Sequence, residues 1–182
     1  MHIFEPFFPN ELHNSTYEIP FEEWYEKGYR GIIFDIDNTL VPHGADADEK
    51  SICLFSRLRE IGFHTVLLSN NKEPRVRRFS EPVGSAYIFK AGKPSGKNYL
   101  RAMELMETDR ETTLFVGDQL FTDVWGAKRL GIYSILVRPI DPREEIQIVL
   151  KRYLEKIVLH AYGKKQGRSA EQGTGRKKGR RI

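Results

Sequence analysis

The chain has 182 residues, of which 40% are hydrophobic and 12% aromatic, and this composition is typical of a globular domain and excludes a wholly disordered chain. No run approaches the roughly 18 apolar residues of a membrane span, and the first residues, MHIFEPFFPNEL, lack the features of a signal peptide, so we expect a cytoplasmic protein. The net charge of +4 is uneven, because the 20 residues from Gly163 onward carry +7 and the rest of the chain carries −3.

Short apolar runs bounded by glycine or polar residues predict buried parallel strands. These runs are GIIFD (31–35), HTVLL (64–68), AYIF (86–89), TLFVG (113–117) and YSILV (133–137). Helical patterns lie between them, and this alternation predicts an α/β fold with a three-layer arrangement around a mainly parallel five-stranded sheet.

The first long helical pattern runs from Asp48 to Ile61 and places Ile52, Phe55 and Leu58 on one face, with Gly62 as the expected C-cap. The only cysteine of the chain, Cys53, lies in this pattern and excludes an internal disulfide and a multi-cysteine zinc site. We expect its thiol to be buried and inert.

Three further helices are expected. One follows Pro94 and Ser95, with Leu100, Met103 and Met106 on one stripe, and a short one, TDVWGAKRLG, ends at Gly131. The segment 141–163 has a helical apolar face that we expect to dock on the sheet. The residues of this face are Ile146, Val149, Leu150, Tyr153, Leu154 and Ile157.

The composition divides the chain into a domain over residues 1–162 and a basic tail over residues 163–182, which we expect to be disordered. The tail could attract an anionic membrane or RNA, or serve only as a solubilising extension. The aromatic residues near the N-terminus could lie at a membrane interface or cover the edge of the sheet as core. They are Phe4, Phe7, Phe8, Tyr17, Phe21, Trp24 and Tyr25.

Polar side chains follow the ends of four predicted strands. The residues concerned are Asp35, Asp37 and Thr39, then Ser69 to Asn71, then Lys93, and finally Asp118 and Asp123. Because ligands of parallel α/β sheets bind outside the carboxyl ends of the strands, these groups should meet in one crevice. Acids, a lysine and a hydroxyl at a common edge predict a site for magnesium and phosphate.

The residue types suit that chemistry. Mg²⁺ prefers hard oxygen ligands, which the side chains of Asp35 and Asp118 and the backbone carbonyl of Asp37 could supply. A carboxylate can form an aspartyl-phosphate, and Lys93 would stabilise charge on the transferring oxygens. Ser69 would hold phosphoryl oxygens, and Asp37 is placed to protonate the leaving group and then to activate water.

The four stretches DIDNTL, LLSNN, KP and GDQLFTD resemble, in order, the motifs of the haloacid dehalogenase (HAD) superfamily. From about Pro9 to Val137 the chain is similar to the YqeG-like, class IIIA phosphatases of that superfamily. The resemblance implies the following roles: Asp35 as nucleophile, Asp37 as acid/base, Ser69 as the motif-two hydroxyl, Lys93 as the motif-three lysine, Asp118 as a metal ligand, and Asp123 as the last motif acid, either bound to the metal or behind its ligands. Asn70 is expected to bind phosphate together with Ser69 and Lys93.

Several of these residues have ordinary alternatives. Ser69 could simply terminate a strand, Lys93 competes with Lys90 and Lys97, and Asp123 could cap the helix that follows it. Thr39 is expected to support the turn, and a lone loop histidine such as His43 usually has no catalytic role.

The spacing of the motifs leaves no room for a cap domain, because 31 residues separate Asp37 from Ser69 and 23 separate Ser69 from Lys93. An open site favours a bulky phosphomonoester. Relatives that resemble this group include phosphatidylglycerophosphate phosphatases, which makes that membrane phospholipid the leading substrate. The alternatives are a phosphatase of nucleic-acid or protein phosphate, and an RNA- or ribosome-associated binding protein on the same scaffold.

Overall fold

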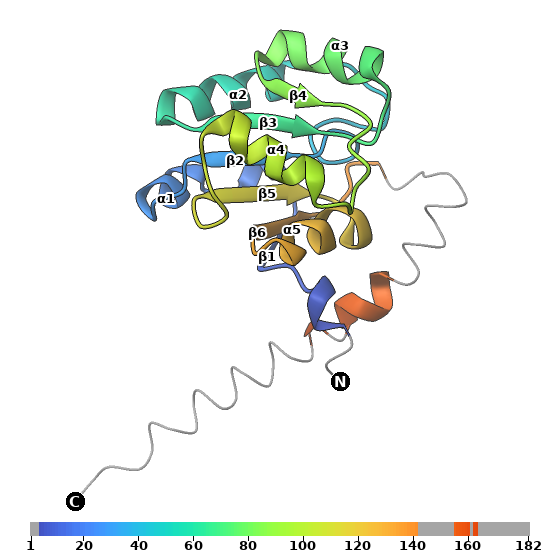
Figure 1. Cartoon of the computed structure of the whole chain (residues 1–182). Coiled ribbons are helices and arrows are strands. Elements are labelled where there is room, and N and C mark those ends of the chain that lie inside the picture. The colour runs from blue at the N-terminus through green and yellow to red at the C-terminus, as the bar shows by residue number, and fades with distance from the viewer. Residues whose placement is uncertain (1–3, 142–154, 161, 164–182) are drawn as a thin grey trace, which may run out of the picture.

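A single parallel sheet forms the centre of the molecule, and its strands are labelled in Figure 1. The computed structural model describes residues 4–141, 155–160 and 162–163. Within this part the sheet has the order β1-β6-β5-β2-β3-β4. Its strands are β1 (Glu11–His13), β2 (Gly31–Phe34), β3 (His64–Leu68), β4 (Ala86–Ile88), β5 (Thr113–Gly117) and β6 (Tyr133–Val137).

The predicted strands are all present, and β1 is an addition to them. This strand is only three residues long, and its single apolar side chain, Leu12, is 46% exposed. It pairs in parallel with the edge of β6, where Glu11 lies opposite Ile135. No local apolar pattern marks it, because backbone pairing with a distant segment is what creates it.

Helices cover both faces of the sheet and give the predicted three layers. Helices α1 (Phe21–Glu26), α2 (Glu49–Ile61) and α3 (Glu73–Val83) pack on one face. Helices α4 (Lys97–Met106) and α5 (Trp125–Arg129) pack on the other. Along β2, Ile32 and Phe34 face the first layer while Ile33 faces the second, as expected for a strand buried on both sides.

The buried faces of two helices differ from the prediction. In α2 the buried apolar residues are Leu54, Phe55 and Leu58, whereas Ile52 is 39% exposed. Cys53 is also exposed, so the expectation of a buried thiol is wrong. Helix α2 begins at a capping box between Asp48 and Ser51, and at 100° per residue the stripe through residues 51, 54, 55 and 58 faces the core.

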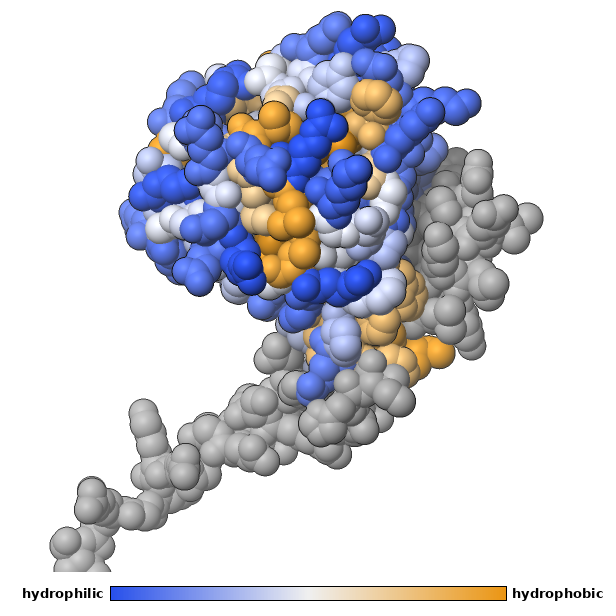
Figure 2. Space-filling view, viewed as in Figure 1, coloured by the Kyte–Doolittle hydropathy of each residue, from blue (hydrophilic) through white to orange (hydrophobic). Residues whose placement is uncertain are grey.

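In α4 the stripe contains Tyr99, Met103 and Met106, and Leu100 is 47% exposed, contrary to the prediction. Figure 2 shows apolar surface over this helix, to which Leu100 and the half-exposed Leu105 contribute. The large ring of Tyr99 occupies the core position beside Phe115.

The short helix predicted at 122–131 is in two parts. A π-helix, η3 (Leu120–Val124), comes directly after β5 and leads into α5. In a π-helix the backbone hydrogen bonds join residues five apart instead of four, and such a turn often marks a functional site. The chain then leaves α5 through Gly131, which has a positive φ of 76°.

The terminal segments meet in a satellite apolar cluster. Residues 155–160 are helical, and Val158 packs there with Phe8 and Leu136, whereas Ile157 is 49% exposed instead of docked. The other residues of the predicted face, Ile146, Val149, Leu150, Tyr153 and Leu154, lie outside the described residues, as does the tail after Gly163.

The N-terminal aromatic residues belong to the core. Phe21 and Trp24 are buried in the cluster beneath α1 and α2, and Phe8 is buried in the satellite cluster. In the short 3-10 helices η1 (Glu5–Phe7) and η2 (Thr16–Glu18), Phe7 and Tyr17 pack against the same clusters. Among the described residues, no helix has the length and apolar character that a membrane span requires.

A tight contact between α4 and α5 generates a test of this packing. A Cβ at Gly126 would lie 2.3 Å from the Tyr99 hydroxyl oxygen. Alanine in a helix is ordinarily favoured over glycine by about 1 kcal/mol, but here a side chain or helix must shift. We expect Gly126→Ala to lower the free energy of unfolding by about 1–3 kcal/mol, measured by urea denaturation.

Gly163→Ala is the matched control, because a Cβ there meets nothing within 4 Å. It should leave the free energy of unfolding within about 0.5 kcal/mol of the parent value. A Gly126→Ala variant as stable as the parent would contradict the close contact between α4 and α5.

Candidate active site

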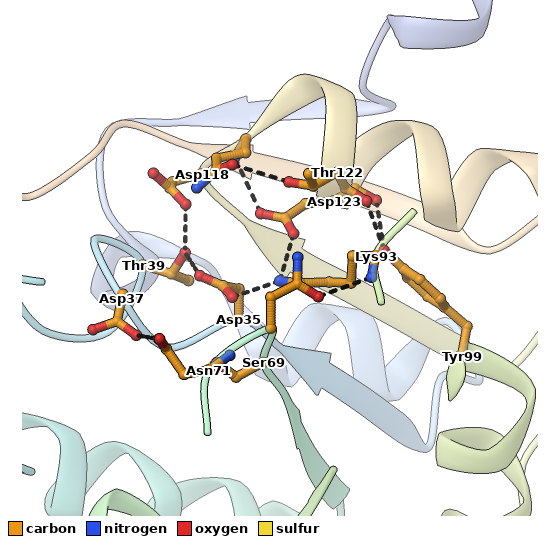
Figure 3. Close-up of polar contacts among 12 residues, drawn as sticks. Asp35, Asp37, Thr39, Ser69, Asn71, Lys93, Tyr99, Asp118, Thr122 and Asp123 are labelled. Carbon is orange, nitrogen blue, oxygen red and sulfur yellow. Dashed lines mark hydrogen bonds and ion pairs between the residues drawn. The ribbon is translucent and has the colours of Figure 1, made fainter. Parts of the chain in front are cut away.

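The predicted site residues gather where the strand order changes direction. Strand β2 has β3 on one side and β5 on the other, and the chain moves from β2 outward to β4 before returning to β5. Such a switch point leaves a crevice outside the carboxyl ends of the strands. Asp35 follows β2, Ser69 follows β3 and Asp118 follows β5, so the three segments meet there (Figure 3).

A buried ammonium group joins two of the acids. The Lys93 Nζ donates to Asp35 Oδ1 at 2.5 Å and to Asp123 Oδ1 at 2.7 Å. Burial opposes the charge on the ammonium, but the carboxylates of Asp123 and Asp35 outweigh that effect and raise the pKa of Lys93 above its usual range. Lys93 is therefore positively charged, and the competing Lys90 and Lys97 are exposed.

Asp35 lies deep in this cluster, with only 7% of its surface exposed. Burial raises the pKa of Asp35 to about 6, and the nearby Asp123 and Asp37 act in the same direction, while Lys93 partly offsets them. Added positive charge near this carboxylate would favour its ionised form further.

The acidic residues can accept a cation. Asp35, Asp118 and Asp123 are buried and each offers a carboxylate oxygen within 4.8 Å of the others. The Thr39 Oγ1 lies between two of them, 3.3 Å from Asp35 Oδ2 and 3.4 Å from Asp118 Oδ1. Buried hard oxygens at this spacing fit Mg²⁺, which takes a few carboxylates and keeps several waters.

Asp123 does not cap the helix after it, which was the structural alternative to a role in the site. Its Oδ2 accepts from the Gln119 backbone N–H at 3.1 Å, so the carboxylate turns back toward the start of η3. Gly117 makes room for it, because a Cβ at that position would lie 2.5 Å from Asp123 Oδ2. The π-helix and the glycine together aim the side chain at Lys93.

Asp37 is directed away from the acidic cluster. Its Oδ1 accepts from the Gly44 N–H at 2.7 Å and from Arg75 Nη2 at 3.0 Å, and its Oδ2 accepts from Asn71 Nδ2 at 2.7 Å. The Asp37 side chain is therefore not one of the three carboxylates that could bind a metal together. Its backbone carbonyl remains a proposed ligand. The His43 Nδ1 is 3.9 Å from Asp37 Oδ1 and its side chain is 62% exposed.

The segment after β3 organises the remaining site residues. Ser69 is buried, and its Oγ accepts from the Asn71 N–H at 3.1 Å. The Asn70 Oδ1 accepts from the Lys93 N–H at 2.8 Å, so Asn70 fixes the backbone that carries the lysine. Of the Asn70 side chain, the Nδ2 group is left to meet a phosphate.

Residues outside the motifs support the loops of the site, and sequence reasoning missed them. Thr16 Oγ1 and Tyr17 Oη donate to the backbone carbonyls of Thr39 and Leu40 at 2.7 and 2.6 Å. Glu155, which is buried, accepts from the Leu120 N–H at 2.9 Å at the start of η3. The sequence gives little signal for Glu155, because the residues one turn before it, Lys151 and Arg152, are also charged.

The raised pKa of Asp35 predicts a pH-dependent instability of the metal-free protein. The folded-state pKa of about 6 lies above the ordinary value of 3.8, so the folded state binds the proton more tightly. Stability therefore falls as pH rises from about 4 to about 6. In EDTA at pH 7.5, Asp35→Asn should be more stable than the parent by about 1–3 kcal/mol, measured by urea denaturation.

At pH 4 the two proteins should differ little in stability. The control is Glu104→Gln, which removes an exposed carboxylate from α4 and should show no such gain. A metal-free Asp35→Asn variant that is no more stable than the parent at pH 7.5 would show that the buried charge is not destabilising.

Comparison with known proteins identifies the family to which the chain belongs. Residues 45–131 match the family of haloacid dehalogenase-like hydrolases. The chain is 39% identical over 160 residues to a probable phosphatase of Bacillus subtilis, YqeG, covering 87% of this chain and 93% of that protein. It is 24% identical over 168 residues to phosphatidylglycerophosphate phosphatase 1 of Arabidopsis thaliana, covering 79% of this chain and 48% of that protein.

A solved structure supports the fold. The cobalt-bound deoxy-D-mannose-octulosonate 8-phosphate phosphatase of Haemophilus influenzae superposes with a TM-score of 0.50 at 14% identity, covering 75% of this chain and 91% of that one. At such low identity the match concerns the fold alone. The extensive match to YqeG shows the family: the chain belongs to the haloacid dehalogenase-like hydrolases, among the YqeG-like phosphatases.

Proposed function

We propose that the protein is a Mg²⁺-dependent phosphomonoester hydrolase that acts through an aspartyl-phosphate on Asp35. The observation that carries this proposal is the buried cluster of Asp35, Asp118 and Asp123 with a charged lysine against two of them. The three buried carboxylates offer the hard oxygen ligands that a divalent cation prefers. When bound, Mg²⁺ supplies positive charge against the phosphoryl oxygens and the nucleophile.

Each residue then has a defined task. Asp35 attacks phosphorus, the ester P–O bond breaks, and its electron pair goes to the leaving oxygen, which takes a proton from Asp37. Water then attacks the phosphorus of the aspartyl-phosphate, giving its proton to Asp37, and Asp35 is regenerated with release of phosphate. Lys93, Ser69 and the amide nitrogen of Asn70 are placed to hold the phosphoryl oxygens.

The proposed metal ligands are the side chains of Asp35 and Asp118 and the backbone carbonyl of Asp37. Asp123 lies within reach of the same position and also holds Lys93, so it links the metal site to the phosphate site. Thr39 supports this arrangement from between Asp35 and Asp118.

The proposed substrate is a bulky or lipid-linked phosphate such as phosphatidylglycerophosphate. The described residues between β2 and β4 form only the catalytic loop, α2, β3 and α3, so no inserted domain encloses the site. The named Arabidopsis relative acts on that lipid phosphate, although this chain spans only 48% of its length. Contact of the basic tail with an anionic membrane would bring the site near such a substrate.

Nucleic-acid or protein phosphates are the second class of substrate that an open site admits. A binding protein without turnover is less well supported, because the acids and the lysine are assembled for phosphoryl chemistry.

The proposed nucleophile is tested with p-nitrophenyl phosphate in Mg²⁺. Because Asp35 forms the covalent bond, Asp35→Asn should lower kcat by at least about 10³-fold while the circular dichroism spectrum is unchanged. EDTA should abolish the activity of the parent, and Mg²⁺ should restore it. Turnover that survives either Asp35→Asn or EDTA would contradict the proposed chemistry.

The substrate class is tested by comparing kcat/KM for three bulky phosphates. These are phosphatidylglycerophosphate in mixed micelles, a 5′-phosphorylated oligonucleotide and a phosphoserine peptide. The proposal predicts the highest value for the lipid, with Asp35→Asn as the control for contaminating activity. A higher value for the oligonucleotide or the peptide would replace the lipid assignment with that class.

A further inference from the structure

Three donors surround the side chain of Asp37 and determine which of its oxygens is available. Within the described part of the chain, Oδ1 accepts from both Gly44 N and Arg75 Nη2, while Oδ2 accepts from Asn71 Nδ2 alone. A carboxylate oxygen has two in-plane acceptor positions. Both positions on Oδ1 are occupied and one on Oδ2 remains, so the oxygen that exchanges a proton is Oδ2.

The donors come from separate segments of the chain. Gly44 belongs to the loop between β2 and α2, Asn71 follows β3, and Arg75 lies in the first turn of α3. Asp37 and Arg75 are both largely buried, with side chains 11% and 13% exposed. A carboxylate held from three sides in this way cannot rotate freely, so its proton-exchanging oxygen has a fixed direction.

Arg75 is placed at some energetic cost. Among the described residues, its Nε and Nη1 are buried without a hydrogen-bond partner. Unsatisfied buried donors are destabilising, and the guanidinium gains a cation–π contact with the Phe79 ring, whose centroid is 5.7 Å away. The hydrogen bond that the guanidinium makes within the described residues is the one to Asp37 Oδ1, which indicates that Arg75 serves to hold Asp37.

We propose that Arg75 and Asn71 are positioning residues for the proton transfer by Asp37, beyond the four motifs that define the site. They aim Oδ2 at the leaving-group oxygen, so that the proton passes from Oδ2 to that oxygen as the ester P–O bond breaks. This inference rests on the proposed phosphatase function, in which Asp37 is the acid.

The role predicts a dependence on the leaving group. p-Nitrophenolate departs readily without a proton, whereas an alkoxide needs one, so only alkyl phosphates depend strongly on a well-placed acid. The test compares kcat/KM, which reports the steps up to P–O cleavage, for p-nitrophenyl phosphate, phenyl phosphate and an alkyl phosphate such as glycerol 3-phosphate.

Arg75→Gln and Asn71→Ala should each lower kcat/KM for the alkyl phosphate by about 10- to 100-fold, part of the roughly 10²–10⁴-fold that general acid catalysis supplies. The loss on p-nitrophenyl phosphate should stay below about threefold. Arg75→Lys keeps the charge and should recover part of the loss. Asp37→Asn gives the upper limit of the effect.

Arg77→Gln is the matched control, since Arg77 is an exposed arginine on the same helix and should leave all three values unchanged. Thermal unfolding identifies any variant that does not fold, and the other variants at Arg75 and Asn71 then decide. Equal losses on aryl and alkyl phosphates, or no loss on either, would overturn the positioning role. Failure of the parent protein to hydrolyse any of the phosphates in Mg²⁺ would instead overturn the proposed function.

Discussion

The buried contact of Lys93 with Asp35 and Asp123 is the interaction on which the organisation of the site depends. Removing an ammonium and two carboxylates from water costs several kcal/mol per ion, and their mutual attraction repays it only if the geometry is good. The two short hydrogen bonds of Lys93 provide that geometry. Asp118 adds a third buried acid nearby, and the three carboxylates together offer oxygen ligands that a divalent cation could use.

Much of the remaining structure keeps this cluster in place. Tyr99 donates to the Thr122 carbonyl at 2.8 Å, and Glu155 accepts from the Leu120 N–H, so η3 is tied to α4 and to the C-terminal helix. Close approaches at Gly117 and Gly126 let η3 and α5 pack against the groups that they hold. The terminal segments therefore stabilise the loop that carries Asp118 and Asp123, which explains why a satellite apolar cluster lies beneath it.

The fold and the main site residues were predictable because they depend on local patterns. Buried parallel strands are apolar runs, and residues at their carboxyl ends must meet at one edge of the sheet. Asp35, Lys93 and Asp118 could therefore be placed together from the sequence. The strand β1 could not, because its three residues become a strand only through pairing with β6.

The partners of Asp37 were equally hidden from the sequence. Arg75 is 38 residues away from Asp37 along the chain and lies on a helix rich in charged residues, where nothing distinguishes it from its exposed neighbours. The exposure of Ile52 and Cys53 could not be predicted from the sequence either, because packing against the sheet sets the rotation of α2 about its axis. Local pattern thus identifies which polar residues meet at the strand ends, and tertiary contact determines how they are oriented.

Covalent trapping of the phosphoryl group shows directly whether Asp35 is the nucleophile. The protein would be mixed with substrate and Mg²⁺, quenched in acid within the first turnover, reduced with borohydride and mapped by mass spectrometry. We expect Asp35 to be converted to homoserine and the other aspartates of the site to be unchanged. Modification of a different residue, or none despite measured turnover, would contradict it.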